Sequence, residues 1–179
     1  MLQQLLLIFK GTHDFYNFTA NRSNNQKPLK RYILNFDIKE ILLHDNIQFI
    51  VFSIQGQSFM LHQIRYMIGF TIMVMRGVIP IDEAKNVFSS RTCQLVKAPA
   101  VGLMLENIHY DYYNKKFKND PGHPPIDWTP CQETALEFKK NIILTHIFDD
   151  EIKNNTTKNW ILPRFDPQSK YWVGKFSNP

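Results

Sequence analysis

The alternation of hydrophobic and polar residues predicts two neighbouring β-strands in the first third of the chain. Residues 31–38 (RYILNFDI) and 47–54 (IQFIVFSI) are rich in β-branched and aromatic residues, and apolar positions alternate with polar ones in the second segment. A period of two is typical of a strand that has one face in the core. Residues 42–46 (LLHDN) contain turn-forming side chains, so we expect them to form the turn between the strands.

A long, mainly apolar segment predicts a helix over residues 58–76, with Ser58 as its N-cap. Its longest apolar run without a charge, residues 66–75, has ten residues. A membrane-spanning helix needs roughly 20 such residues. The segment is therefore predicted to be a helix of the protein core, and no membrane partner is expected.

The remaining pattern predicts several helices and one more strand. We expect a helix near the N-terminus, a short helix after the long one, a strand, a proline-rich loop and two helices in the tail. These are residues 1–10, 80–90 (PIDEAKNVFSS), 102–113 (GLMLENIHYDYY), 119–130, 131–146 and about 149–161. This order predicts an α+β fold, with an antiparallel or mixed sheet packed with helices.

The composition indicates a folded, basic protein. Hydrophobic residues make up 44% of the chain, which is enough for a core, and the net charge of +5 favours a phosphate-bearing partner. The two cysteines, Cys93 and Cys131, lie far apart, which fits a reducing compartment better than a disulfide framework. We expect an intracellular protein, with the nucleus, the mitochondrion and the cytoplasm all open. No metal-binding spacing and no glycine-rich phosphate loop occur, so no metal is expected.

Arg65 is the most informative residue, because it interrupts the apolar helix. Burial of an unpaired guanidinium costs on the order of several kcal/mol, so Arg65 should have a partner. On a helix, His62 and Gly69 lie on the same side as Arg65. Gly69 has no side chain and would allow another segment to approach closely. Arg65 either reaches the surface or a structural carboxylate, or it holds a carboxylate that is essential for catalysis.

Residues 11–19 (GTHDFYNFT) and the basic loop that follows are candidates for RNA contact. Phe15 could stack on an unstacked base or fill the protein's own core. His13 could act as a general acid or base, or as a structural hydrogen-bonding residue. The basic loop could contact phosphates, or its charges could only increase the solubility of the protein. Its four basic residues are Arg22, Lys27, Lys30 and Arg31.

Three stretches together resemble one family, the TruA-type tRNA pseudouridine synthases, in its eukaryotic branch. They are residues 11–22 (GTHDFYNFTANR), 56–69 (GQSFMLHQIRYMIG) and 97–117 (KAPAVGLMLENIHYDYYNKKF). The resemblance runs over residues 11–128 and continues more loosely to residue 163. It implies isomerisation of uridine to pseudouridine in tRNA, or in other RNAs, without a cofactor. It also implies that the target uridine is flipped into a cleft, where an essential aspartate acts.

The resemblance assigns roles to individual residues. Arg65 matches the arginine that pairs with the essential aspartate, and Leu103 matches an apolar residue that lines the uracil pocket. His13, Phe15, His62 and Arg22 are then candidates for substrate binding.

The family's aspartate motif, R-T-D-x-G-V, does not occur in these 179 residues, and Asp14 is a poor substitute. We therefore expect residues 1–128 to be the C-terminal part of a catalytic domain, and residues 129–179 to be a helical extension with a poorly ordered end. The expected partners are tRNA and the upstream half of the same enzyme, and the isolated chain is expected to be inactive. A non-catalytic RNA-binding module is the alternative.

Overall fold

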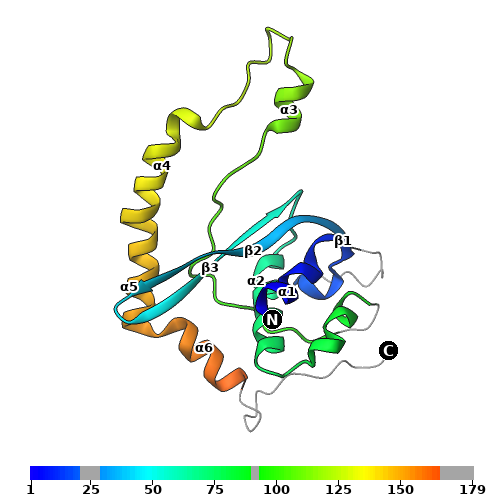
Figure 1. Cartoon of the computed structure of the whole chain (residues 1–179), viewed down its shortest axis with the longest axis vertical. Helices are drawn as coiled ribbons and strands as arrows, with labels where there is room; N and C mark the ends of the chain where they lie inside the picture. Colours follow the sequence, from blue (N-terminus) through cyan, green and yellow to red (C-terminus); the bar gives the residue numbers. More distant parts are fainter. Residues whose placement is uncertain (21–28, 90–92, 166–179) are drawn as a thin grey trace. The chain divides into compact units, whose positions relative to one another are not determined.

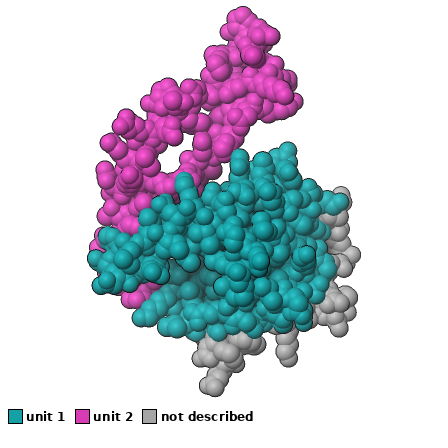
Figure 2. Space-filling view, in the orientation of Figure 1, with its two compact units in different colours: residues 1–99, 156–179 teal, residues 100–155 magenta. Residues whose placement is uncertain are grey.

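The computed structural model describes residues 1–20, 29–89 and 93–165 of the chain. The chain forms two compact units: unit 1 comprises residues 1–99 with 156–179, and unit 2 comprises residues 100–155 (Figure 2). The predicted basic residues Arg22 and Lys27, and the end predicted to be poorly ordered, lie outside the described residues. The predicted domain division at residue 128 stays a prediction.

Unit 1 is built on a three-stranded antiparallel sheet in the order β1-β2-β3 (Figure 1). The strands are β1 (Gly11–Asp14), β2 (Lys30–His44) and β3 (Ile47–Gly56). The two predicted strands and the α+β class are confirmed, but β2 continues to His44, so the turn predicted over residues 42–46 is only Asp45–Asn46. Asp45 and Asn46 in the turn have φ values of 45° and 61°, as the two central residues of a tight type I′ hairpin require. β1 was not predicted, because four residues are too few to show a period of two.

Helical segments pack around this sheet. Residues 2–9 are helical, within the predicted range 1–10, and the predicted short helix after residue 80 is present as a 3-10 helix. The helical elements of unit 1 are α1 (Leu2–Leu6), η1 (Leu7–Phe9), η2 (Tyr16–Phe18), α2 (Gln63–Met75), η3 (Ile81–Phe88) and α6 (Thr156–Arg164). Among the described residues, none of these helices has the length and apolar character needed to cross a membrane.

Phenylalanine rings form the centre of the core of unit 1. Phe9 lies 5.6 Å from Phe18, 5.5 Å from Phe36 and 5.9 Å from Phe70, measured between ring centroids, and all four rings are buried. The Phe9–Phe18 and Phe9–Phe70 pairs are edge-to-face, an arrangement that adds about 0.5–1.5 kcal/mol per pair to the burial of the rings. Because these residues come from η1, η2, β2 and α2, the cluster fixes α2 against the sheet and against the segment after β1.

The predicted start of the long helix is wrong. α2 begins at Gln63 and not at Ser58, because His62 has a φ of 64° and so adopts the left-handed conformation. A left-handed residue cannot continue a right-handed helix. The Gln63 Oε1 atom accepts the Met60 N–H at 2.9 Å, which closes the turn before the helix. Ser58 therefore lies before this turn and does not cap the helix.

Unit 2 consists of irregular chain and helices. The predicted strand over residues 102–113 is wrong: no strand forms there, and a helix begins at Asp111. A strand is stable only when a neighbouring strand satisfies its backbone groups, and no described strand pairs with this segment. The helical elements are α3 (Asp111–Lys116), η4 (Thr129–Cys131), α4 (Gln132–Phe138), η5 (Lys139–Leu144, a π-helix) and α5 (Thr145–Asn154).

The predicted tail helices are confirmed, but they join at a different place. Helical structure continues from Gln132 to Asn154, and Asn155, with a φ of 49°, separates α5 from α6. The predicted loop over residues 119–130 is also present, up to the short η4 at its end.

Asn17 connects two segments that are far apart in the sequence. Its side-chain amide donates to the Val87 carbonyl at 2.7 Å, and its Oδ1 atom accepts the Cys93 N–H at 3.0 Å. Asn17 is almost fully buried. It therefore satisfies a backbone carbonyl near the end of η3 and the backbone N–H of Cys93, where the chain resumes after η3.

We expect Asn17→Leu to lower the free energy of unfolding by about 2–4 kcal/mol, because it leaves a buried carbonyl and a buried N–H without partners. Urea denaturation measures the change. Asn107→Leu is the matched control, because Asn107 is exposed in unit 2, and it should change stability by less than about 0.5 kcal/mol. Equal stability of Asn17→Leu and the unchanged chain would contradict this anchoring role.

Candidate functional site

Residues 95–98 run along α2 in very close contact, and Gly69 permits this. A Cβ atom added at Gly69 would lie 1.7 Å from the carbonyl oxygen of Val96, a distance that no side chain can occupy. Gly69 is buried in the middle of the helix. The expectation that another segment approaches the helix at this glycine is therefore confirmed. We call residues 95–98 the strap.

The strap holds Arg65 by two hydrogen bonds of opposite direction. The Arg65 Nε–H donates to the Ala98 carbonyl at 2.6 Å, and the Ala98 N–H donates to the Arg65 carbonyl at 3.1 Å. Among the described residues, no carboxylate forms an ion pair with Arg65. The partner observed for this arginine is thus a backbone carbonyl. The aspartate that the resemblance assigns to Arg65 was expected from outside these 179 residues, and this pairing stays a prediction.

Two further basic side chains lie near Arg65. His62 precedes α2, and Lys97 precedes Ala98 in the strap. Desolvation, followed by the positive charges of Lys97 and then Arg65, lowers the pKa of His62 below its ordinary value of 6.5. Nearby positive charge disfavours the protonated imidazole. We call these three residues the basic cluster. Because the lowered pKa leaves His62 mainly neutral at neutral pH, Lys97 and Arg65 supply its positive charge, beside the amino end of α2, where the helix dipole also favours an anion.

Asp14 does not belong to the basic cluster. Its Oδ1 atom accepts the Tyr16 N–H at 3.1 Å and the Leu29 N–H at 2.9 Å. The carboxylate therefore satisfies backbone donors on either side of the loop between β1 and β2. This structural role supports the expectation that Asp14 is a poor substitute for a catalytic acid.

The predicted RNA-binding residues His13 and Phe15 lie beside the core. Phe15 is 0% exposed, and its ring packs against Phe18 and Phe88 with centroid distances of 5.4 Å to each. The core alternative therefore applies to Phe15, since its faces are covered. His13 stacks on Phe88 at 4.4 Å, and its Nε2 atom lies 2.9 Å from the Lys10 carbonyl oxygen. Its partly buried ring is thus placed by structural contacts.

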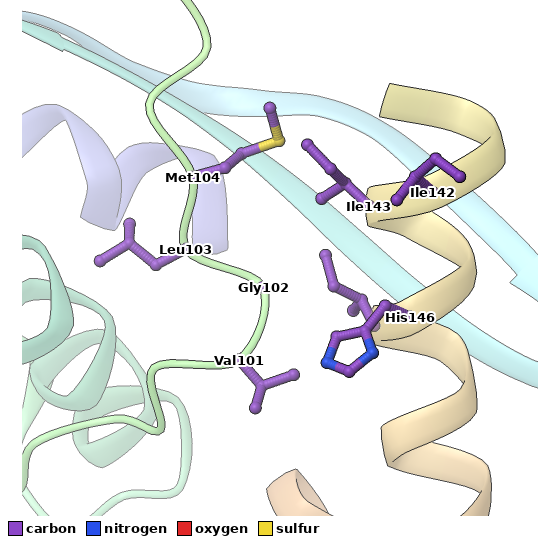
Figure 3. Close-up of a pocket in the computed structure, with 8 residues that line it drawn as sticks. Val101, Gly102, Leu103, Met104, Ile142, Ile143 and His146 are labelled. Carbon is purple, nitrogen blue, oxygen red and sulfur yellow. The ribbon is translucent and has the colours of Figure 1, made fainter. Parts of the chain in front are cut away.

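Leu103 belongs to unit 2, where it lines an apolar pocket of about 310 Å³. Figure 3 shows that the Leu103 side chain points away from the helix that carries Ile143, whereas Met104 points toward Ile143. Leu103 is 48% exposed, so a further surface could cover it. The role in a uracil pocket stays a prediction. The pocket is lined by Val101, Gly102, Leu103, Met104, Ile142, Ile143, His146 and Ile147.

Two parts of the site were missed by the reasoning from single residues. One is the Ala98 carbonyl, which binds Arg65, and the other is Lys97, which adds positive charge. Both lie at the start of the third motif, and Gly69 indicated that some segment passes there, but no pattern identified which one. Among the described residues, no three His, Cys, Asp or Glu side chains come together in a way that could hold a metal ion.

Comparison with known proteins places these features in one family. The family described as tRNA pseudouridine synthase matches residues 6–111, which include α2 and the strap. The chain is 33% identical over 160 residues to the Pseudouridylate synthase 1 homologs of Mus musculus and Homo sapiens, covering 89% of this chain and 38% of each relative. It is 36% identical over 154 residues to tRNA pseudouridine synthase 1 of Candida albicans, covering 86% of this chain and 25% of the relative. The chain thus spans about a quarter to two fifths of the length of these relatives.

The basic cluster predicts a specific response of His62. We expect Lys97→Gln to raise the pKa of His62 toward 6.5, because Lys97 has the larger effect of the two neighbouring charges on this pKa. A histidine whose pKa is lowered by folding contributes stability at neutral pH that is lost as the pH falls through 6.5 and below. Lys97→Gln should therefore make the chain less sensitive to acid in this range. Titration of the His62 ring followed by NMR measures the pKa.

Lys85→Gln is the matched control, because Lys85 is an exposed lysine on η3. It should leave the His62 titration unchanged. An unchanged pKa in Lys97→Gln would show that Lys97 lies too far away to act, and would contradict the basic cluster.

Proposed function

This chain belongs to the TruA-type family of tRNA pseudouridine synthases, and on this premise we propose that it forms the C-terminal part of an enzyme that isomerises uridine to pseudouridine in tRNA. The observation that carries the proposal is the state of Arg65. The strap fixes this arginine at Nε, while no described carboxylate pairs with it. An arginine held in this way is suited to receive an acid from another segment.

The proposed reaction breaks the bond between the uracil N1 atom and the ribose C1′ atom, turns the base and joins it again through carbon. The essential aspartate would come from an R-T-D-x-G-V segment outside these 179 residues. Arg65 would keep this carboxylate ionised, since a neighbouring positive charge lowers the pKa of a carboxyl group. Its role would be to orient the carboxylate and to keep it ionised.

The Ala98 bond also determines how Arg65 would grip the acid. A guanidinium can bind a carboxylate with two parallel hydrogen bonds, either through Nε and one Nη or through both Nη groups. Nε already donates to Ala98 at 2.6 Å. We infer that the carboxylate meets the two Nη groups end-on, and that the carbonyl prevents the guanidinium from rotating away.

The basic cluster and Leu103 would complete the substrate site. Lys97 would attract an RNA phosphate, because no described acid forms an ion pair with it. His62 would bind the RNA as a neutral hydrogen-bonding group, since its pKa is lowered. Leu103 would line the uracil pocket, as the resemblance implies. Arg22 would add a phosphate contact. His13 has structural contacts already, and any role of this residue with RNA would be secondary to them.

We predict that the 179-residue chain alone forms no pseudouridine in unmodified tRNA, because it lacks the aspartate motif. Tritium release from labelled tRNA measures this. A longer chain that carries an R-T-D-x-G-V segment ahead of these residues, which we call the completed enzyme, should be active. In the completed enzyme, Arg65→Lys should reduce activity about a hundredfold or more, because an ammonium cannot reproduce the planar grip.

Arg76→Lys is the matched control, because Arg76 is exposed at the other end of the same helix, and it should retain activity. Turnover by the chain alone would contradict the proposal, and Asp14→Asn would then identify the acid. A completed enzyme that binds tRNA and forms no pseudouridine would favour the alternative, a non-catalytic RNA-binding module.

A further inference from the structure

A polar groove of about 500 Å³ lies in unit 1, and none of its lining residues belongs to the basic cluster. Its volume falls within the usual range for small-ligand sites, which is about 300–1,000 Å³. Side chains from β1, from the start of β2 and from the residues after β3 line the groove. They are Thr12, Lys30, Arg31, Tyr32, Gln57 and Ser58.

Tyr32 is an exposed aromatic residue that lines this groove and whose backbone is anchored on both sides. It pairs with Thr12 across β1 and β2, and its carbonyl accepts the Gln57 N–H at 3.1 Å. Three chain segments therefore fix its backbone, yet the residue is 46% exposed. A fixed, exposed aromatic ring is the usual platform on which proteins stack an unpaired base of RNA.

Two cations without acid partners among the described residues, Lys30 and Arg31, also line the groove. Among the described residues, neither Lys30 nor Arg31 forms an ion pair. The Arg31 Nη1 atom donates to the Lys30 carbonyl at 2.8 Å, and its buried Nε atom has no acceptor within the described part of the chain. A guanidinium whose observed acceptor is only the neighbouring carbonyl can turn to a stronger one, and a phosphate oxygen is such an acceptor.

We propose that this groove binds one nucleotide of single-stranded RNA, with the base stacked on Tyr32 and the phosphate between Lys30 and Arg31. The Thr12 and Ser58 hydroxyls and the Gln57 amide supply hydrogen-bonding groups for the ribose and the base edge. The combination of an aromatic platform, neutral polar groups and two cations fits a nucleotide better than an acidic peptide, which would need the cations alone. The inference rests on the proposed function, because it assigns a second contact to the same RNA.

Binding of a fluorescent single-stranded RNA of about 12 nucleotides to the 179-residue chain tests the groove. We expect Tyr32→Leu to weaken binding about five- to hundredfold, the effect of losing one stacked base, and Tyr32→Phe to retain it. Arg31→Gln should lower the slope of log affinity against log salt by about one, as loss of one phosphate contact requires. Thermal melting followed by circular dichroism checks that each variant is folded.

Tyr112→Leu is the matched aromatic control, because Tyr112 is 79% exposed in unit 2 and does not line the groove. Lys85→Gln is the matched control for charge. Both should bind RNA as the unchanged chain does. A folded Tyr32→Leu variant with unchanged affinity would overturn the inference, as would equal losses in Tyr112→Leu or an unchanged chain that binds no RNA.

Two further outcomes separate the groove from its rivals. A polyglutamate peptide that binds as tightly as RNA and depends equally on Tyr32 would identify an acidic peptide site and overturn the inference. If the completed enzyme with Tyr32→Leu forms pseudouridine normally and the chain with Tyr32→Leu binds RNA normally, the groove inference fails while the proposed function stands. If the completed enzyme is inactive but binding still depends on Tyr32, the proposed function fails and the groove stands.

Discussion

The hydrogen bond from Arg65 Nε to the Ala98 carbonyl is the interaction on which the candidate site depends. It forms because Gly69 lets the strap lie against α2 closer than any side chain would allow. The reciprocal bond from the Ala98 N–H to the Arg65 carbonyl fixes the register between strap and helix. Asn17 holds the chain before the strap, through its bond to the Cys93 N–H, so the strap is anchored at both ends.

This constraint gives Arg65 its orientation before any acid is present. Catalytic groups act most effectively when their surroundings fix them in advance, because no reorganisation is then needed during the reaction. Lys97 adds positive charge near the same place, and together with Arg65 it keeps His62 mainly neutral. A site with two cations, Arg65 and Lys97, and no described acid in an ion pair with either of them is electrostatically incomplete, and it favours the binding of a carboxylate or a phosphate.

Local patterns in the sequence predicted the features that depend on neighbouring residues. The β2–β3 hairpin followed from a period of two and from the Asp45–Asn46 turn, and the close approach at Gly69 followed from a glycine beside Arg65 in an apolar helix. The start of α2 could not be predicted, because it depends on the left-handed conformation of His62. The partner of Arg65 could not be predicted either, because Ala98 is brought to it by tertiary contacts that no local pattern encodes.

The wrong prediction for residues 102–113 has a similar cause. The segment has the residue types of a strand, but a strand also needs a partner, and the described chain provides none there. The exposed side chain of Leu103 is consistent with a surface that another segment covers. Residue types thus predicted which segments can become strands, whereas the partners available decide which of them do.

A double-mutant cycle on the completed enzyme tests most directly whether Arg65 receives its acid from the R-T-D-x-G-V segment. The free energy of unfolding in urea is measured for Arg65→Met, for Asp→Asn in the motif and for both changes together. The cycle subtracts the loss of the Ala98 bond, which both Arg65→Met variants share. The proposed pair predicts a coupling energy of about 1–3 kcal/mol, whereas a coupling below about 0.5 kcal/mol would show that the two groups do not meet and would contradict this account.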